Sequence, residues 1–436
     1  MRGVGLRKKS GAGGALPGMA VRQERKPRPS VPIVSAPAAA AVERGESGPV
    51  SPRNDASASS TGPVGGAGGD SASGGGGGGG AADDVGGEDG GGAAASLSAP
   101  SASSSDGDRL LAKYRKVTSQ RVFTLEELRK VCWFGISPAV RVEAWQMLMG
   151  YLPTNPDRRA ATLERKRQEY RDLVVEVYDQ PAKYRSESER ALFHQIEIDV
   201  PRTCPSLQLF QFPRLMRTME RVLYIWAIRH PASGYVQGIN DLVTPFVHVF
   251  LDARLDVDVE EADFDELAAI SDADWADVEA DCFWCLCKLL DGIQDNYTFA
   301  QPGIQRLVFK LKELLQRVDT PLHEHVEAQG LPFIQFAFRW FNCLLMREFR
   351  LRSIVRMWDT YLSEENGNGF AEFHVYVCTA LLTTYSEELR TRDFQELVMF
   401  LQDLPTASWG DKEVEMLLSQ AFLYSNLFKR ASAHLA

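Results

Sequence analysis

The segment Gly234-Tyr-Val-Gln-Gly-Ile-Asn-Asp241 decides how this chain can fold, because it separates two helix-forming stretches. It follows Pro231 and precedes an apolar run at 242–251. Glycine and proline interrupt helices, and glycine permits sharp turns, so this pattern predicts a tight turn between two helices. The side-chain amide of Gln237 would project from the turn, where it could hold a water or a phosphate oxygen. A turn with no functional duty is the alternative interpretation.

A second interrupted segment, Ile196-Glu-Ile-Asp-Val-Pro-Arg-Thr203, lies earlier in the chain. Pro201 disfavours helical geometry at the preceding residue and lacks a backbone donor, so the helix before it should end around Asp199. Arg202 then lies just beyond a helix end. Asp199 is close enough to orient the Arg202 guanidinium through a charge-assisted pair. The alternative is an ordinary surface salt bridge, which contributes little.

Apolar residues at helical spacing continue through most of the chain. Thr124 and Glu127 can form a capping box for a helix that should stop near Gly135, and Ser137-Pro138 offers a capping side chain and a first-turn proline to the next helix. Alternating strand patterns are scarce, and no repeat of about 30 to 50 residues is present. We therefore predict an irregular all-α fold. Further helical stretches lie at 157–178, 215–226, 283–290, 333–345, 354–362 and 373–385.

The first quarter of the chain has a different composition from the rest. Residues 1–106 contain no Phe, Trp or Tyr and include seven consecutive glycines at 74–80. Such a Gly/Ala/Ser-rich tail cannot bury enough apolar surface to offset its ordering entropy, so we expect it to be disordered. A lead-in helix is expected at 107–134 and one domain at 135–430, with its motif-bearing core at about 135–366.

The charge of the chain is concentrated in one region. Residues 1–106 carry 10 Lys/Arg and 10 Asp/Glu, so the net −10 belongs to the remainder. Residues 252–281 hold thirteen acidic side chains and a single basic one, Arg254. This balance argues against a nucleic-acid partner. We interpret the acidic run as a solvated loop, with a docking site for a basic partner as the alternative.

Several patterns that could indicate metal, cofactor or membrane binding are incomplete. The seven cysteines are scattered through apolar helical stretches, which is typical of reduced core residues in a cytoplasmic protein. Cys282, Cys285 and Cys287 lack further ligands, and His-Glu-His at 323–325 is expected to form a surface turn, so no metal site is predicted. The glycine run lacks the Gly-Lys-Ser/Thr of a phosphate-binding loop. The longest apolar run, 242–251, is too short for a transmembrane segment.

The two interrupted segments resemble the paired signatures of the TBC family of Rab GTPase-activating proteins, I-x-x-D-x-x-R and Y-x-Q. Ile196, Asp199 and Arg202 match the first signature. Tyr235 and Gln237 match the second. Both signatures are complete.

Other blocks extend the resemblance over roughly residues 122 to 430. Gly135-Ile-Ser-Pro-Ala-Val-Arg141 with Trp145 looks like the opening block of the family, and Val355-Arg-Met-Trp-Asp359 looks like a later block. The stretches 226–234 and 289–303 are similar to the Golgi-associated member-22 branch. The acidic run and the glycine-rich tail lie outside the family motifs.

The resemblance implies an all-α activator that acts in trans on a GTP-loaded Rab GTPase in vesicle trafficking and is not itself the enzyme. Arg202 would be the arginine finger, and Gln237 would be the glutamine finger that orients the attacking water. GTP and Mg²⁺ would be carried by the GTPase, so the chain needs no cofactor or metal of its own. Asp199 would orient the Arg202 loop, while Tyr235 and Gly238 would shape the Gln237 turn. Since both fingers must reach one γ-phosphate, we expect them to converge at one exposed groove.

Arg141, Trp145, Trp358 and Asp359 are interpreted as residues that hold the domain together. A catalytically silent TBC-fold adaptor, which binds a Rab or Golgi trafficking proteins, stays open as the alternative to an activator. A helical scaffold unrelated to GTPases is a third hypothesis. The branch resemblance implies a cytoplasmic protein that is peripheral at Golgi membranes. The sequence does not identify the Rab or the oligomeric state.

Overall fold

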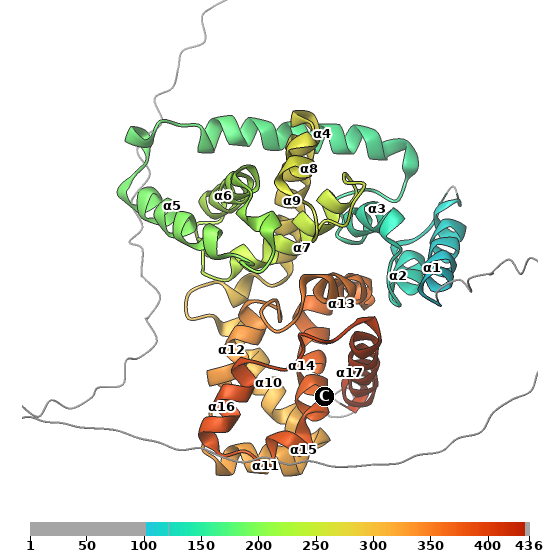
Figure 1. The fold of residues 1–436 in the computed structure, drawn as a ribbon, viewed down its shortest axis with the longest axis vertical. Helices are drawn as coiled ribbons and strands as arrows, with labels where there is room; N and C mark the ends of the chain where they lie inside the picture. Colours follow the sequence, from blue (N-terminus) through green and yellow to red (C-terminus); the bar gives the residue numbers. More distant parts are fainter. Residues whose placement is uncertain (1–101, 121, 432–436) are drawn as a thin grey trace, which may run out of the picture. The chain divides into compact units, whose positions relative to one another are not determined.

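The computed structural model describes residues 102–120 and 122–431, and within them the chain forms helices and no strands (Figure 1). The predicted all-α fold class is confirmed. The α-helices of these residues are α1 (Ala102–Thr118), α2 (Leu125–Cys132), α3 (Pro138–Leu148), α4 (Arg159–Leu173), α5 (Glu187–Asp199), α6 (Pro213–Arg229), α7 (Ile239–Asp252), α8 (Phe264–Ala269), α9 (Asp272–Gly292), α10 (Pro302–Val318), α11 (Thr320–Ala328), α12 (Phe333–Asn342), α13 (Leu351–Ser363), α14 (His374–Thr384), α15 (Ser386–Leu389), α16 (Phe394–Gln402) and α17 (Asp411–Ala431).

The lead-in region contains two helices rather than the expected single one, because α1 and α2 are separate and pack against each other. Helix α1 begins at Ala102, so its first five residues fall within the expected tail, and the rest of that tail lies outside the described residues. Helix α2 starts at the predicted capping box, in which the backbone N–H of Thr124 donates to Glu127 Oε2 at 2.8 Å.

The entry into α3 differs from the prediction. Pro138 occupies the first turn as expected, but the side chain of Ser137 makes no capping hydrogen bond. Tertiary contacts fix the chain here instead. The backbone N–H of Ile136 donates to Asp359 at 3.0 Å, and its carbonyl accepts from Arg141 Nη2 at 2.7 Å.

Helix α9 is surrounded by α4, α6 and α7 and carries two buried carboxylates. Glu279 accepts hydrogen bonds from Tyr170 at 2.8 Å and Thr218 at 2.9 Å, and it pairs with Arg221 at 2.5 Å. On the same helix Asp281 accepts hydrogen bonds from Gln146, Tyr151 and Arg167.

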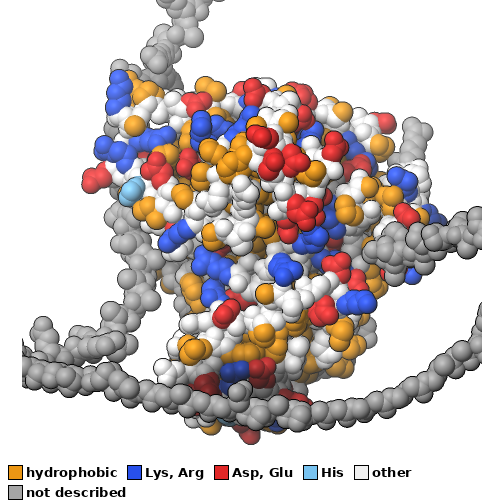
Figure 2. All heavy atoms as spheres, in the orientation of Figure 1, with side chains coloured by type: hydrophobic (Ala, Val, Ile, Leu, Met, Phe, Trp, Pro, Cys, Tyr) orange, Lys and Arg blue, Asp and Glu red, His pale blue; other side chains and the backbone are white. Residues whose placement is uncertain are grey.

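The interpretation of residues 252–281 as a solvated loop is therefore wrong. The run contains α8 and the first half of α9, and its last acidic residues are buried in ion pairs. Acidic side chains also cap helices here, since Asp263 accepts from the backbone N–H of Glu266 at 2.9 Å. Figure 2 shows the exposed remainder as acidic side chains gathered over α8 and the start of α9. Helix packing and capping thus account for much of the run.

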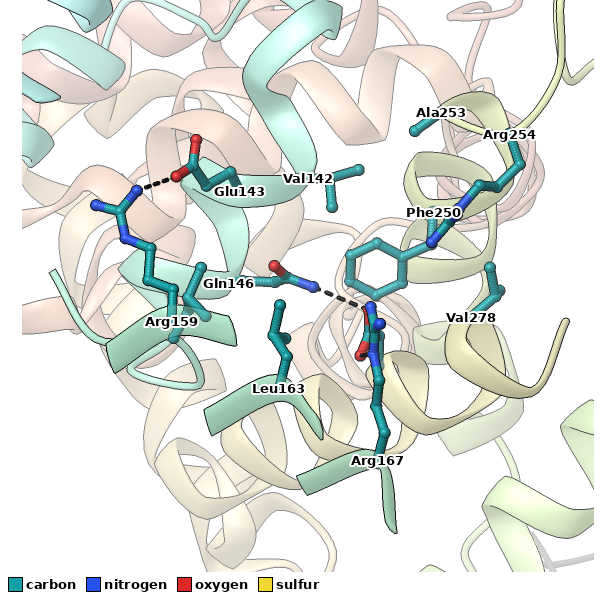
Figure 3. Close-up of a pocket in the computed structure, with 12 residues that line it drawn as sticks. Val142, Glu143, Gln146, Arg159, Leu163, Arg167, Phe250, Ala253, Arg254 and Val278 are labelled. Atoms are coloured by element: carbon teal, nitrogen blue, oxygen red, sulfur yellow. Dashed lines mark hydrogen bonds and ion pairs between the residues drawn. The ribbon is translucent and has the colours of Figure 1, made fainter. Parts of the chain in front are cut away.

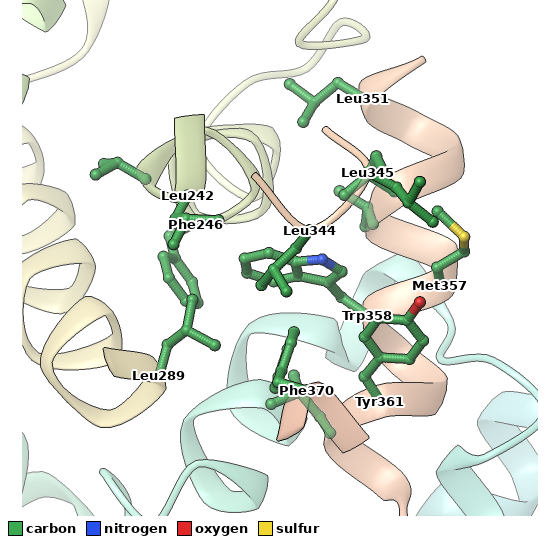
Figure 4. Packing of buried hydrophobic residues seen from close by; sticks show 14 of the residues in the cluster. Leu242, Phe246, Leu289, Leu344, Leu345, Leu351, Met357, Trp358, Tyr361 and Phe370 are labelled. Atoms are coloured by element: carbon green, nitrogen blue, oxygen red, sulfur yellow. The ribbon is translucent and has the colours of Figure 1, made fainter. Parts of the chain in front are cut away.

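Helix α13 connects early and late helices of the domain, because it packs against α2, α3 and α7 and also against α17. Its Trp358 is fully buried (Figure 4). The Trp358 ring lies 6.0 Å from that of Trp145, 5.3 Å from that of Phe246 and 4.9 Å from that of Phe370, measured between centroids. Residues far apart in sequence therefore share one aromatic core.

Asp359, next to Trp358, receives polar groups from the opening block of the domain. It is fully buried and accepts from Trp145 Nε1 at 2.7 Å. The Arg141 guanidinium lies 3.3 Å from the same carboxylate. Four residues interpreted as structural, Arg141, Trp145, Trp358 and Asp359, thus meet in one place.

Most of the cysteines are buried in the core, and the His-Glu-His sequence lies on a helix. All seven cysteines are free, and all except Cys204 are buried. His323 and His325 lie on α11, so the expected surface turn is a helix. In the described part of the chain no group of three or more His, Cys, Asp or Glu could hold a metal ion. None of the helices described is both long and apolar enough to traverse a bilayer.

Candidate functional site

Arg202 lies in the short turn that follows α5. As predicted, α5 ends at Asp199, and Pro201 falls in the 3-10 turn Val200–Arg202. The Arg202 side chain is 51% exposed, and its Nη2 pairs with Oδ1 of the fully buried Asp199. One edge of the guanidinium is therefore held by the domain while the side chain remains accessible.

Gln237 lies in the turn between α6 and α7, where the sequence predicts it. The residue is exposed, and its side-chain amide has no hydrogen-bond partner among residues 102–120 and 122–431. Gly238 follows with a φ of +110° and precedes the first residue of α7. A Cβ at Gly238 would lie 2.2 Å from Nδ2 of Asn342, so this position requires glycine for both its backbone and its surroundings.

A hydrogen-bond network connects the two turns. The Tyr235 hydroxyl lies 2.7 Å from Asp199 Oδ2 and 3.1 Å from Asn240 Oδ1. Asn240 accepts from the backbone N–H of Gly238 at 3.0 Å and donates to Thr203 Oγ1 at 2.9 Å. The turn that carries Arg202 and the turn that carries Gln237 are thus fixed to each other through Asp199 and Asn240.

Tyr235 acts in this network as a neutral hydrogen-bond donor. Burial, reinforced by the hydrogen bond to Asp199, raises the pKa of Tyr235 above its ordinary value. The phenol therefore keeps its proton and can donate throughout the physiological range. Burial also raises the pKa of the Cys204 thiol to about 11, so this neighbour of the Arg202 turn stays protonated and is a poor nucleophile.

Sequence reasoning missed three polar residues that support the Gln237 turn. Asn240 lies within the quoted segment, where its side-chain role had no local signal. Asn342 donates from Nδ2 to the backbone carbonyl of Gln237 at 2.9 Å. Arg347 donates from Nε to Asp241 at 2.9 Å. The last two come from more than 100 residues downstream, so only the folded chain brings them to the turn.

A separate cavity of about 270 Å³ lies between α3, α4, α7 and α9 (Figure 3). No residue of the two turns lines it. Its three arginines are paired, Arg159 with Glu143, Arg167 with Asp281 and Arg254 with Asp274. The cavity therefore has little uncompensated positive charge with which to bind an anion, and it is not part of the candidate site.

The two turns carry a guanidinium and a side-chain amide, and the hydrogen-bond network holds the turns together. A guanidinium can stabilise negative charge on phosphate oxygens. A side-chain amide can both donate to and accept from a water molecule. The network joins the two turns, while convergence of the two side chains on one phosphate stays a prediction.

Comparison with known proteins identifies the family of the chain. Residues 138–390 match the family described as Rab-GTPase-TBC domain. The chain is 48% identical over 328 residues to the GTPase-activating protein gyp1 of Schizosaccharomyces pombe, covering 74% of this chain and 62% of that protein. It is 50% identical over 325 residues to TBC1 domain family member 22B of Homo sapiens, covering 74% and 63% respectively. The chain thus spans less than two thirds of the length of these relatives.

A solved structure extends the similarity to three dimensions. The crystal structure of the Ypt/Rab-GAP domain of Gyp1p matches with a TM-score of 0.69 at 45% identity, covering 74% of this chain and 99% of that one. The expected resemblance to the TBC family and its member-22 branch is confirmed. The predicted limits of the domain, 135–430, stay a prediction. The family match and the shared fold together show that the chain belongs to the Rab-GTPase-TBC domain family.

Proposed function

We propose that this protein accelerates GTP hydrolysis by a Rab-family GTPase, to which it supplies Arg202 and Gln237 in trans. The observation that carries the proposal is the pair of exposed polar side chains on two turns that one buried carboxylate, Asp199, joins. The names of the relatives as GTPase-activating proteins agree with it. GTP and Mg²⁺ belong to the GTPase, which is the enzyme of the pair.

Arg202 would stabilise charge during phosphoryl transfer. The γ-phosphoryl group passes through a loose transition state in which negative charge spreads over its oxygens and the leaving oxygen. The guanidinium of Arg202 would enter the GTPase site and neutralise that charge. Its pairing with Asp199 limits the orientations it can adopt beforehand, which reduces the entropy lost when it binds.

Gln237 would orient the attacking water. Its amide can accept one hydrogen of the water with its oxygen and donate to a phosphate oxygen with its nitrogen. In this role it would replace the glutamine that a GTPase ordinarily supplies for the same purpose.

The first test is single-turnover GTP hydrolysis by a panel of purified, GTP-loaded Rabs. For a Rab that the wild-type protein stimulates, Arg202→Ala should lower the stimulated rate by roughly 10³- to 10⁵-fold. Arg317→Ala is the matched control, because Arg317 is an exposed arginine at the end of α10. Undiminished stimulation by Arg202→Ala would refute the assignment. Thermal unfolding should be nearly unchanged in Arg317→Ala and only slightly lowered in Arg202→Ala, because the buried Asp199 keeps its hydrogen bonds from Gln195 and Tyr235.

The second test is Gln237→Ala with the same Rab. We expect a severe loss of stimulation even when the GTPase retains its own glutamine, because Gln237 takes over the orientation of water. Full activity would indicate a mechanism with Arg202 alone. If the wild-type protein binds GTP-loaded Rabs but stimulates none, the alternative of a silent TBC-fold adaptor is favoured.

The location of the protein is part of the same proposal. We propose that the protein is cytoplasmic and peripheral at Golgi membranes, recruited by a Rab or by Golgi adaptor proteins, and the sequence resemblance of 226–234 and 289–303 to the Golgi-associated member-22 branch supports this. Microscopy of the tagged full chain against a Golgi marker tests this. A diffuse distribution that does not respond to an activated Rab would contradict it.

A further inference from the structure

We propose that Asn342 is a positioning residue for Gln237, an inference that rests on the proposed function. Asn342 is the last residue of α12 and is only 5% exposed. Its Nδ2 donates to the backbone carbonyl of Gln237 at 2.9 Å, across 105 residues of sequence. The turn that carries Gln237 is therefore held by the end of α12 as well as by the Asp199 network.

The side chain and main chain of Asn342 are themselves fixed. Its Oδ1 lies 3.5 Å from Nε2 of Gln301, at the long end of a hydrogen bond. Its backbone carbonyl accepts from the hydroxyl of the buried Tyr297 at 2.8 Å. The amide therefore has its nitrogen toward a carbonyl and its oxygen toward a donor, which is the orientation its chemistry requires.

The chain that follows Asn342 has little freedom. Leu344 and Leu345, two and three residues further on, have φ values of +49° and +61°, an unfavourable backbone for leucine. Both leucines are buried, at 1% and 0% exposure, in the cluster around Trp358 (Figure 4). Burial of the two side chains compensates for the backbone conformation. The position of Asn342 is thus set by the core of the domain.

Close packing makes the contact specific to this turn. Nδ2 of Asn342 would lie 2.2 Å from a Cβ at Gly238, so the amide sits directly against the backbone after Gln237. The side chain of Gln237 has no hydrogen-bond partner among the described residues. The direction of its amide therefore depends on how firmly the main chain of the turn is held, and Asn342 holds the carbonyl of that same residue.

Asn342 supports only the turn that carries Gln237, whereas the Asp199 network supports both turns. Asp199 pairs with Arg202, whereas Asn342 contacts the main chain of Gln237 and makes no hydrogen bond to the Arg202 turn among the contacts of the described chain. Loss of the Asn342 donor should therefore impair the step that needs an oriented water and leave the contribution of Arg202 in place. Misplacement of a positioned group by about 1 Å can cost on the order of 100-fold in rate.

The test is a double-mutant cycle on the full chain with a Rab that the wild-type protein stimulates. Asn342→Ala should lower the stimulated kcat about 10- to 100-fold, with little change in KM for the GTP-loaded Rab. In a Gln237→Ala background the same change should have almost no further effect, because the group that it positions is gone. Asn342→Asp, which keeps the shape but lacks the donor, should behave like Asn342→Ala.

Controls and opposite outcomes separate this inference from the proposed function. Asn426→Ala removes another amide that donates to a backbone carbonyl, that of Phe422 at 3.0 Å, and should change nothing. Rates are expressed per molecule competent to bind a Rab loaded with a non-hydrolysable GTP analogue, so partial unfolding is not counted. An equal loss in both Gln237 backgrounds, or full kcat in Asn342→Asp, would overturn the positioning role. Absence of stimulation by the wild-type protein would instead overturn the proposed function.

Discussion

Asp199 has no exposed surface, yet three side chains donate to its carboxylate. Gln195 donates to Oδ1 at 3.2 Å, Arg202 pairs with the same oxygen, and the Tyr235 hydroxyl lies 2.7 Å from Oδ2. A buried carboxylate is tolerated only when its oxygens are satisfied in this way. The residue therefore orients Arg202 and at the same time ties the glutamine turn to α5.

Tyr235→Phe should show how much the hydrogen bond from the Tyr235 hydroxyl to Asp199 stabilises the domain. The variant removes the donor to Oδ2, and we expect a loss of about 1 to 3 kcal/mol in the free energy of unfolding, measured with urea. Because burial raises the pKa of Tyr235, the phenol is neutral and the loss should be the same at pH 6 and pH 8. Tyr184→Phe, at a site 69% exposed, is the control. Equal stability of the Tyr235 and Tyr184 variants would contradict this account.

Residue-level prediction succeeded where the signal was local. Pro201 and Gly238 interrupt the helices, so the turns that carry Arg202 and Gln237 could be found from spacing, while the roles that the family resemblance implies for the two side chains stay a prediction. Asn342 has no such signal, because an asparagine at a helix end is ordinary in sequence. Its contact with Gln237 exists only once α12 and the turn are packed together.

At the scale of elements, α12 and α14 are joined by a buried histidine. Nε2 of His374 lies 3.0 Å from the carbonyl of Trp340, which can only accept, so Nε2 carries the proton. Nδ1 then accepts from the Tyr361 hydroxyl at 3.0 Å. Both ring nitrogens are satisfied in the neutral form. The helix that ends at Asn342 is thus fixed partly by an uncharged imidazole.

This histidine should make the stability of the domain sensitive to acid. Burial lowers the pKa of His374 to about 4, against roughly 6.5 in the unfolded chain. The unfolded chain therefore binds the proton more tightly. The contribution of His374 is complete above about pH 6.5 and is lost as the pH falls toward 4, by about 3 kcal/mol in all.

The measurement compares wild type with His374→Gln, so that other titrating groups cancel. The difference in the free energy of unfolding between the two proteins should shrink as the pH falls from 7 to 4.5. A difference that stays constant over this range would show that His374 does not titrate as its burial requires.

Helix boundaries were more predictable than helix packing. The capping box of Thr124 and Glu127 gave the start of α2, because capping involves residues three apart. The buried Glu279 and Asp281 gave no such signal, since their partners Arg221 and Arg167 lie 58 and 114 residues away. Acidic spacing alone therefore suggested a loop where the chain forms α8 and α9.

At the scale of the whole molecule, Asp359 connects the opening block with α13. The contacts with Ile136 and Trp145 span 223 and 214 residues. The sequence could mark both blocks as structural through the family resemblance, but it could not show that one carboxylate joins them. Contacts of this range are the ones that make a domain unfold as a unit.

Asp359→Ala should therefore destabilise the entire domain. Removing the acid leaves the indole N–H of Trp145 and the backbone N–H of Ile136 without their acceptor, and removes the partner of Arg141. We expect a loss of about 3 to 5 kcal/mol, with tryptophan fluorescence and far-ultraviolet circular dichroism giving coincident urea transitions. Asp403→Ala, at an exposed position, is the control. If fluorescence and circular dichroism gave urea transitions that do not coincide, the role of Asp359 in the stability of the whole domain would be contradicted.

The pairing of the half-exposed Arg202 with the buried Asp199 also affects how proteins of this family can diverge. If Arg202 is replaced, Asp199 still accepts hydrogen bonds from Tyr235 and Gln195, so the frame of the site survives. Under the proposed mechanism, a single nucleotide change at the Arg202 codon could then turn an activator into a protein that still recognises a GTPase and no longer switches it off. Selection could retain such a copy, since its folding would be undisturbed.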